Sequence, residues 1–185
     1  MSPRLAFIGF GEAGQAMAAG LREDGVSQIA AWDILFSDTA GTGLVEAAQA
    51  SGVRVASSAA DAVRDAKIVI AAVTAASSTD AAQSVAGHLQ GKPLYLDVNS
   101  VSPGRKQTTA MLLGDEARYV DAAIVSAIHP ARHKSPMMLA GPHAAEAEPV
   151  LAALGMKTQI VGDEVGAAAA IKMIRSVMIK GIEAL

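Results

Sequence analysis

The stretch LAFIGFGEAGQAMAAGL, residues 5 to 21, decides the fold of this chain. An apolar run leads into Gly9, Gly11 and Gly14, and small or apolar residues then recur at helical spacing. In such a turn the first glycine permits the tight bend, the second lets a pyrophosphate approach the backbone, and the third lets helix and strand pack closely. The order of strand, glycine turn and helix therefore favours a dinucleotide site. The same glycines also suit a sharp turn that binds nothing, and this alternative stays open at this point.

The phosphates at such a site are held by the backbone. The first N–H groups of the helix have no intrahelical partner, and they lie at the positive end of the helix dipole. We therefore expect the whole turn to contact the cofactor, namely Gly9, Phe10, Gly11, Glu12, Ala13 and Gly14.

An acidic residue stands where the adenosine ribose of a dinucleotide is expected. Asp33 ends the next apolar run, IAAWD, about 20 residues after the last glycine, at the distance typical of a ribose-binding carboxylate. Its alternative role is that of an ordinary turn residue. A carboxylate here would repel a 2′-phosphate, and no Arg or Lys follows before Arg54. The cofactor is therefore expected to be NAD or NADP, with NAD favoured.

The rest of the chain alternates short apolar runs with longer Ala-rich segments. This pattern predicts a doubly wound α/β fold of Rossmann type, a mostly parallel sheet with helices on both faces. We expect strands at 4–10, 28–33, 53–56, 67–73, 93–98, 118–124, 137–141 and 157–161. We expect helices at 12–23, 43–51, 59–65, 79–89, 102–113, 143–154 and 164–185.

Composition excludes several classes of protein. The chain has 185 residues, 51% of them hydrophobic, which suffices for one domain with a core. No uncharged apolar stretch reaches the roughly 18 to 20 residues that span a bilayer, and the amino terminus lacks the pattern of a signal peptide, so we expect a cytoplasmic protein that does not bind membranes. There is no cysteine, and the four His are scattered, so no metal site is expected. A net charge of −3 with dispersed basic residues gives no surface for nucleic acid.

In open α/β sheets, ligands bind beyond the carboxyl ends of the strands. Val73 and Thr74 follow one predicted strand, and Asn99 and Ser100 follow the next. Asn99 and Ser100 suit a nicotinamide ribose or a substrate carboxylate. Ser102 also lies here, but its position before Pro103 favours a helix cap.

Two histidines lie in the irregular segment IHPARHK. His129 and His133 are therefore candidates for a catalytic role if this loop faces the site. Histidines in loops are more often exposed to solvent, and this second interpretation is preferred.

Several motifs, taken in order, resemble one family over nearly the whole chain. They are IGFGEAG, the acid at Asp33, DVNSVSP, VDAAIVSA, MMLAGP and LAALGMKTQIVGDEVGAAAAIK. Together they resemble the nucleotide-binding half of the β-hydroxyacid dehydrogenases, which include 6-phosphogluconate and 3-hydroxyisobutyrate dehydrogenases, and most closely a less characterised branch of them. The resemblance implies an oxidoreductase that transfers hydride between NAD(P) and a small hydroxy or keto acid. It also implies a dinucleotide-binding domain over 1–163, and a helix from 164 to 185 that leads into an all-helical domain.

The resemblance also implies roles in catalysis. Lys172 takes the position of the family's catalytic lysine, as general acid and base, and Ser126 that of a serine that holds a substrate carboxylate. The family's Ser-Gly-Gly is here Ser126-Ala127-Ile128, and its later Asn is replaced by Arg175 and Ser176. We expect Arg175 to lower the pKa of Lys172 and to bind a substrate carboxylate or phosphate. Without the resemblance, these cations fit an ordinary solvated helix face.

Two other functions remain open from the sequence. One is an imine reductase that uses the same cofactor site, and the other is a dinucleotide-binding module without turnover. The last helix carries an apolar stripe at Ile171, Ile174, Met178 and Ile182, which has no partner in the expected fold. We therefore expect a homo-oligomer that acts on a small-molecule substrate.

Overall fold

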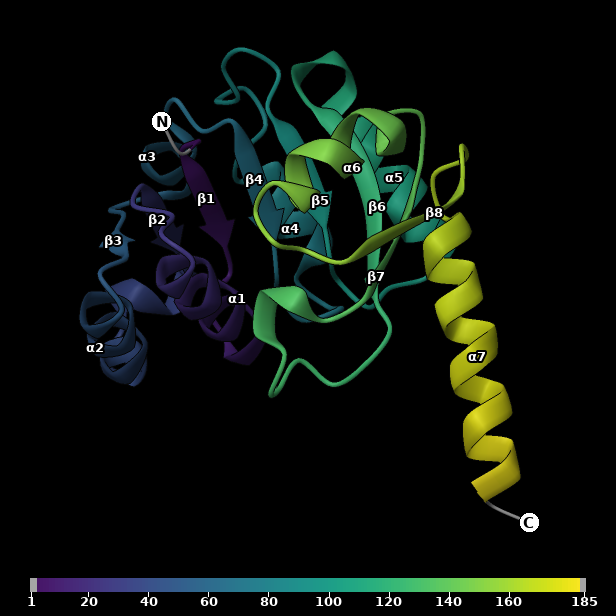
Figure 1. Ribbon diagram of the computed structural model, residues 1–185. Coiled ribbons are helices and arrows are strands. Elements are labelled where there is room, and N and C mark those ends of the chain that lie inside the picture. Colours follow the sequence, from purple (N-terminus) through teal and green to yellow (C-terminus); the bar gives the residue numbers. More distant parts are fainter. Residues whose placement is uncertain (1–2, 184–185) are drawn as a thin grey trace.

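The computed structural model describes residues 3–183 as one eight-stranded sheet flanked by helices (Figure 1). The strands are β1 (Leu5–Ile8), β2 (Ile29–Trp32), β3 (Arg54–Val55), β4 (Ile68–Ala71), β5 (Leu94–Asp97), β6 (Arg118–Ile124), β7 (Met137–Ala140) and β8 (Thr158–Gly162). The longer helices are α1 (Glu12–Glu23), α2 (Thr42–Ala50), α3 (Ala59–Val63), α4 (Ser78–Gln83), α5 (Pro103–Leu113), α6 (Ala144–Ala152) and α7 (Ala167–Glu183). Each strand predicted from the sequence has a counterpart in the sheet.

The strand order is β3-β2-β1-β4-β5-β6-β7-β8, and every neighbouring pair is parallel except β6 and β7. The predicted doubly wound, mostly parallel sheet is thus confirmed. The order reverses between β1 and β4, which are neighbours although two strands separate them in the chain. Ligands of such sheets bind at this reversal, outside the carboxyl ends of the strands.

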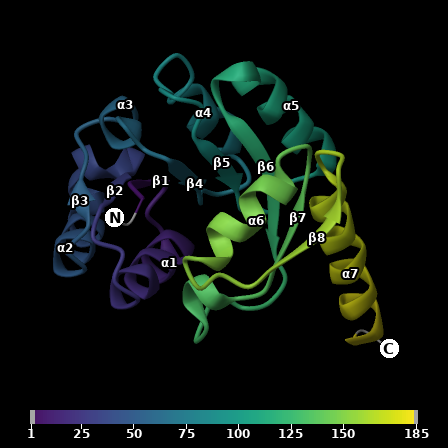
Figure 2. The ribbon, with the colours of Figure 1, turned by 45° about the horizontal axis from the view of Figure 1, so that its top comes forward.

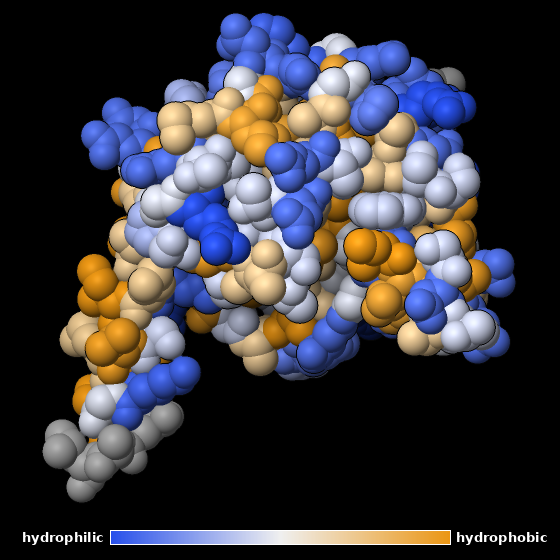
Figure 3. Space-filling view, turned by 180° about the vertical axis from the view of Figure 1, so that it is seen from behind, coloured by the Kyte–Doolittle hydropathy of each residue, from blue (hydrophilic) through white to orange (hydrophobic). Residues whose placement is uncertain are grey.

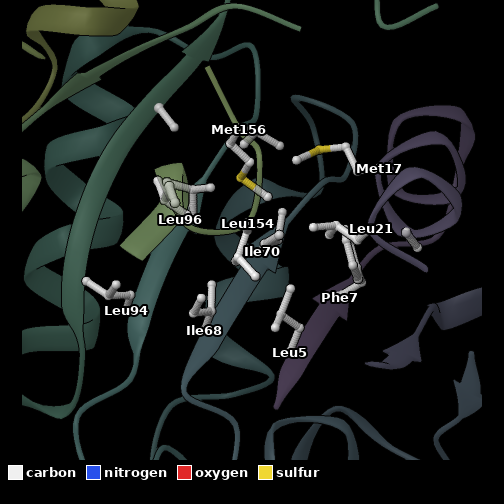
Figure 4. Packing of buried hydrophobic residues seen from close by; sticks show 14 of the residues in the cluster. Leu5, Phe7, Met17, Leu21, Ile68, Ile70, Leu94, Leu96, Leu154 and Met156 are labelled. Carbon is white, nitrogen blue, oxygen red and sulfur yellow. The ribbon is translucent and has the colours of Figure 1, made fainter. Parts of the chain in front are cut away.

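The central strands are buried on both faces because their side chains alternate between two cores. Leu5 and Phe7 of β1 join one apolar cluster, which includes side chains of α1 and of the segment after α6 (Figure 4). Ala6 and Ile8 point the other way, into a cluster with α3 and α4. Each large side chain buried in this way contributes about 1.5 to 3 kcal/mol of hydrophobic stabilisation. Accordingly, α1 and α6 lie on one side of the sheet and α3, α4 and α5 on the other (Figure 2).

Several predicted boundaries are wrong. The helix expected at 79–89 ends at Gln83, since Ser84 bonds back to the carbonyl of Ala81 and Gly87 has a positive φ of 79°. The segments 34–37 and 39–41 form two 3₁₀ turns that no pattern predicted. The last helix begins at Ala167 rather than 164, because Gly166 adopts a φ of 103° that a helix cannot contain. Residues 184 and 185 of that prediction lie outside the described residues.

Helix α7 projects from the body of the protein with much of its apolar surface uncovered (Figures 1 and 3). Its first turn is buried on the sheet through Ala168 and Ala169. Farther along, Ile174, Val177 and Ile182 are 62, 72 and 70% exposed. Contiguous apolar surface of this kind marks a site of association. The predicted homo-oligomer remains a prediction.

Candidate functional site

In the glycine turn between β1 and α1, the fold requires two of the three glycines but not the other one. Gly9 has a φ of 92°, and a Cβ there would overlap the carbonyl oxygen of Ala72. A Cβ on Gly14 would come within 2.6 Å of the oxygen of Gly9. At Gly11, by contrast, a Cβ would meet no atom of the described residues within 4 Å, apart from those of its chain neighbours. Packing within the protein therefore explains the first and third glycines, and it leaves open space above the second.

The start of α1 is free to bind an anion. Gly11 occupies the cap position and supplies no side-chain hydrogen bond, so the first amides of the helix have no capping partner. Gly11 and Glu12 are exposed and Ala13 is half-buried, which leaves this end of the helix accessible. Phe10 differs, since its ring is buried against Phe36, and it presents only backbone to the site. These features fit a pyrophosphate held by backbone groups, as expected from the sequence.

Asp33 lies directly beside the glycine turn. Its Oδ2 accepts a hydrogen bond of 2.7 Å from the backbone N–H of Phe10, and its Oδ1 accepts one of 3.0 Å from Leu35. The carboxylate is half-buried and follows Trp32, the last residue of β2. Because each carboxylate oxygen has a second lone pair, Asp33 can still accept bonds from a ribose. The structure also gives Asp33 a second role, which is to fix the shape of the turn.

A pocket of about 500 Å³ opens at the carboxyl ends of β4, β5 and β6, against the first turns of α7. Among its predicted members are Asn99, Ser100 and Lys172. The full lining is Ala75, Ala76, Asn99, Ser100, Val101, Ser102, Arg105, Ala123, Ala169, Lys172, Met173 and Ser176. The pocket therefore combines segments far apart in the sequence.

Asn99 connects this pocket to the loop after β4. Its Oδ1 accepts a hydrogen bond of 2.7 Å from the N–H of Val73, which fixes the side chain. Its Nδ2 is buried and has no hydrogen-bond partner within the described residues. A buried donor without a partner is costly, so Nδ2 is available to a polar group of a bound molecule. Thr74, the neighbour of Val73, bonds to Ser77 and does not line the pocket.

Lys172 points into the pocket, where its Nζ donates a hydrogen bond of 2.8 Å to Ser100 Oγ. Burial lowers the pKa of Lys172, and the positive charge of Lys106 lowers it further. The expectation that Arg175 provides the neighbouring cation is wrong. Arg175 is exposed and does not line the pocket, since its direction from the helix differs from that of Lys172.

Lys106 lies under the pocket and is completely buried. It forms ion pairs with Asp97 at 3.1 Å and with Asp121 at 3.3 Å. Asp97 also accepts a hydrogen bond of 2.7 Å from the hydroxyl of Tyr119. Burial and the charge of Asp97 raise the pKa of Tyr119, which keeps this phenol protonated as a donor.

Other candidates lie away from the pocket. Ser126 donates to the adjacent carbonyl of Ala127 and is not among the lining residues. His133 is buried against α1, with its Nε2 3.0 Å from Asp24 Oδ2, and Gly20 provides the space for its ring. The structure thus does not bring His133 to the site, and His129 does not line the pocket either.

The sequence analysis missed Arg105 and Lys106. Both follow Ser102-Pro103, the start of a helix that begins at the carboxyl edge of the sheet. In sheets of this class, the first-turn residues of a helix that begins at the carboxyl edge lie near the ligand. The position of Arg105 and Lys106 shortly after Ser102-Pro103 could therefore have indicated them from the sequence. Within residues 3–183 no cluster of possible metal ligands occurs, and no described helix is long and apolar enough to cross a membrane.

The fold and the glycine turn together define a nicotinamide dinucleotide-binding domain. A family model, the NAD binding domain of 6-phosphogluconate dehydrogenase, matches residues 4–162, and the chain belongs to this family. The resemblance inferred from the motifs is thereby confirmed, as is NAD or NADP as the cofactor class. The choice of NAD over NADP remains a prediction.

Two relatives without assigned functions are similar over nearly the whole chain. A conserved hypothetical protein from Sinorhizobium meliloti 1021 is 38% identical with a TM-score of 0.90, and the match covers 100% of this chain and 62% of that one. An uncharacterized 28.5 kDa protein from Methanothermus fervidus is 30% identical over 182 residues, which are 98% of this chain and 67% of the relative. The chain thus spans about two thirds of the length of these relatives.

Two enzymes share the fold at lower identity. The 3-hydroxyisobutyrate dehydrogenase of Mycobacterium tuberculosis is 24% identical with a TM-score of 0.84, and the match covers 97% of this chain and 60% of the enzyme. An imine reductase variant from Myxococcus stipitatus, determined with NAD+, is 24% identical with a TM-score of 0.78, over 98% and 62% of the two chains. At this identity the likeness concerns the fold alone.

Proposed function

We propose that this chain is the cofactor-binding part of an NAD(P)-dependent oxidoreductase that interconverts a small hydroxy acid and its keto acid. The observation that carries the proposal is the contact between Lys172 and Ser100, in a pocket next to the buried and unpartnered amide of Asn99. The division at residue 163, with α7 as the start of an interdomain helix, belongs to the same proposal. It is supported by the exposed apolar side chains of α7.

The residues present fit a nicotinamide dinucleotide. Gly9 to Gly14 would hold its pyrophosphate, Asp33 its adenosine ribose, and Asn99, beside Val73, its nicotinamide half. The bound group would supply the acceptor or donor of a hydride. This assignment uses the open space at Gly11 and the free amide of Asn99, which the fold itself does not need.

Lys172 is the proposed general acid and base. In oxidation, its neutral amine takes the proton of the substrate hydroxyl while hydride leaves the same carbon, so that a carbonyl forms. In reduction, its ammonium returns that proton to the carbonyl oxygen. A general base works best with a pKa near the working pH, and burial together with Lys106 moves the pKa of Lys172 in that direction. Ser100 holds the amine in place by accepting its hydrogen bond.

The charges around the pocket favour an anionic substrate. Arg105 and Lys172 are the charged residues among the described lining, and no carboxylate lines it. Arg105 uses one nitrogen to bond the carbonyl of Ala75 at 2.9 Å, which leaves its other donors available. We assign to Arg105 the substrate-binding role that the sequence analysis gave to Arg175. Ser126 stays a candidate only if the loop that carries it moves toward the pocket.

The test has two stages. Calorimetric titration of this chain with NADH and with NADPH at fixed ionic strength measures cofactor binding, and absence of binding to both contradicts the proposed site. Turnover of the protein at its full natural length is then measured with a panel of 2- and 3-hydroxy acids and their keto acids, alongside cyclic imines. Turnover of imines alone would replace the proposed function by that of an imine reductase. Binding without turnover of either class would favour a module that only binds dinucleotide.

A further inference from the structure

A group of three charged side chains is fully buried between the sheet and α7. Lys106 comes from α5, Asp97 from the end of β5, and Asp121 from β6, and all three are 0% exposed. The Lys106 ammonium lies between the two carboxylates, and it also donates to the carbonyl oxygens of Asp97 and Ala122. We call these three side chains the buried cluster.

The buried cluster is attached to the helix that carries Lys172. Asp121 Oδ2 accepts hydrogen bonds from the backbone N–H groups of Gly166 at 3.0 Å and Ala169 at 3.2 Å. The amide of Gly166 directly precedes α7 and the amide of Ala169 lies in its first turn, where helix N–H groups otherwise lack partners. The carboxylate also lies at the positive end of the helix dipole. Asp121 therefore ties the start of α7 to the middle of the sheet.

The buried cluster is also attached to the opposite wall of the pocket. Asp97 Oδ1 accepts a hydrogen bond of 3.0 Å from the N–H of Asn99, and Asn99 in turn holds the N–H of Val73. One chain of contacts thus runs from the loop after β4, through the cluster, to the first turn of α7. Ser100 directly follows Asn99 in this chain of contacts, and Lys172 lies three residues after Ala169, so the chain holds both partners of the Ser100–Lys172 hydrogen bond.

Stability alone does not explain three charges in this place. Replacing buried ion pairs by apolar side chains of similar volume is often neutral or stabilising, because desolvation offsets the attraction. What a hydrogen-bonded buried charge group supplies instead is a fixed geometry.

We propose that Lys106, Asp97 and Asp121 form a positioning cluster that fixes the first turn of α7 on the sheet and so holds Lys172 against Ser100. This inference rests on the proposed role of Lys172. The three residues touch neither substrate nor cofactor in this scheme, and they act through Lys172 and Asn99.

Burial is the main cause of the lowered pKa of Lys172, and one charge of the buried cluster adds to it. The other charged side chain that lines the pocket with Lys172 is Arg105 on α5, and Lys106 on the same helix is paired with Asp97 on β5 and Asp121 on β6. Of these, Lys106 lowers the pKa of Lys172, in addition to burial. A loosened first turn of α7 would expose Lys172 and raise its pKa toward the ordinary lysine value of about 10.4.

The test uses the variant Asp121→Leu in the whole chain. Leucine is of similar size but has no acceptor, so the link to α7 is lost while Lys106 keeps its ion pair with Asp97. Loss of a negative charge would by itself lower the pKa of Lys172, so a higher pKa must come from a loosened first turn. Two signals are measured by NMR, namely the pKa of Lys172 from ¹³Cε-lysine spectra and the hydrogen exchange of the Gly166 and Ala169 amides. We expect a higher pKa of Lys172 and at least about tenfold faster exchange of both amides, which corresponds to about 1.4 kcal/mol.

The controls separate positioning from general damage. Arg54→Gln removes an exposed ion pair at the other end of the sheet and should change neither signal. The amide of Val73, held by Asn99, should keep its exchange rate in Asp121→Leu. If Asp121→Leu does not fold, the smaller Asp121→Ala provides the same two signals with Lys106 and Asp97 still paired.

An unchanged Lys172 pKa together with unchanged exchange at Gly166 and Ala169, in a folded variant, would overturn the positioning role. NADH titration of the wild-type chain is run in parallel. Absence of NADH binding would contradict the proposed function and leave the NMR result for the cluster valid, so the two failures are distinguishable.

Discussion

The glycine turn and the Lys172 pocket lie at the same edge of the sheet but are built differently. The turn uses backbone amides, open space at Gly11 and one carboxylate, Asp33, and its residues lie within a short stretch of chain. The pocket uses side chains from β5, α5, β6 and α7, with a buried charge cluster under it. Under the proposed function, the turn would bind the cofactor through its backbone and shape, whereas the pocket would control a proton through placed charges. Substitutions in the turn should therefore change the affinity for the cofactor, and substitutions in the pocket should change the rate of turnover.

The largest effect is expected from Lys172→Met. Loss of a general acid and base lowers kcat by about 10² to 10⁴-fold. The affinity for NADH should stay within about twofold, because the glycine turn is unchanged. Steady-state kinetics with the substrate found in the panel, and NADH titration, measure the two quantities. Lys180→Met, on an exposed part of the same helix, is the matched control. Full turnover by the Lys172 variant would remove the proposed mechanism.

The second prediction compares two glycines of the same turn. Gly9→Ala should lower the free energy of unfolding by about 2 to 4 kcal/mol, because its φ of 92° and the nearby Ala72 carbonyl do not accommodate a methyl group. Gly11→Ala should change stability by less than about 0.5 kcal/mol. It should nevertheless weaken NADH binding about tenfold or more, since the methyl group would occupy the space assigned to the pyrophosphate.

Urea unfolding and NADH titration of both variants check this prediction. Normal NADH affinity in Gly11→Ala would show that the turn does not hold phosphate, and the difference between the two regions would then disappear.

The third prediction concerns the cofactor preference set by Asp33. Asp33→Asn keeps an acceptor for the N–H of Phe10 but removes the negative charge. A charged hydrogen bond contributes about 1.5 to 3 kcal/mol, so NADH affinity should fall about tenfold. NADPH affinity should fall less or rise, because repulsion of a 2′-phosphate is removed. Parallel titrations with NADH and NADPH provide the ratio, and an unchanged ratio would assign Asp33 to the shape of the turn alone.

The smallest effect is a dependence of stability on pH at His133, outside both regions. Burial lowers the pKa of His133 despite the neighbouring Asp24. The unfolded chain therefore takes up a proton first as the pH falls, so this contribution to stability is complete above about pH 6.5 and declines below it. Thermal unfolding between about pH 8 and pH 5 should show a decline that is smaller in His133→Asn. An equal slope in both proteins would assign the decline to other groups.

The sequence predicted the turn well because its signals are local. Gly9, Gly11 and Gly14 fall within one turn, and Asp33 ends the next strand, so their spacing alone brings them together. Lys172 and Ser100 are 72 residues apart, and the family resemblance was needed to single out Lys172.

The errors at the pocket have a common physical cause. Arg175 was expected beside Lys172 because residues three apart lie close on a helix. Which part of the helix surface meets the pocket depends on how Asp121 fixes its first turn, and this contact spans 45 and 48 residues. Lys106 looked like any solvated helix lysine, and its burial depends on two carboxylates from separate strands.

The position of Trp32 makes its intrinsic fluorescence a reporter of the glycine turn. It is the only tryptophan in the sequence, it is half-buried, and it directly precedes Asp33 at the end of β2. The emission of an indole overlaps the absorption band of a reduced nicotinamide, so excitation energy should pass from Trp32 to bound NADH. Quenching of this emission would report occupancy of the turn without any label, one residue away from the carboxylate assigned to the ribose.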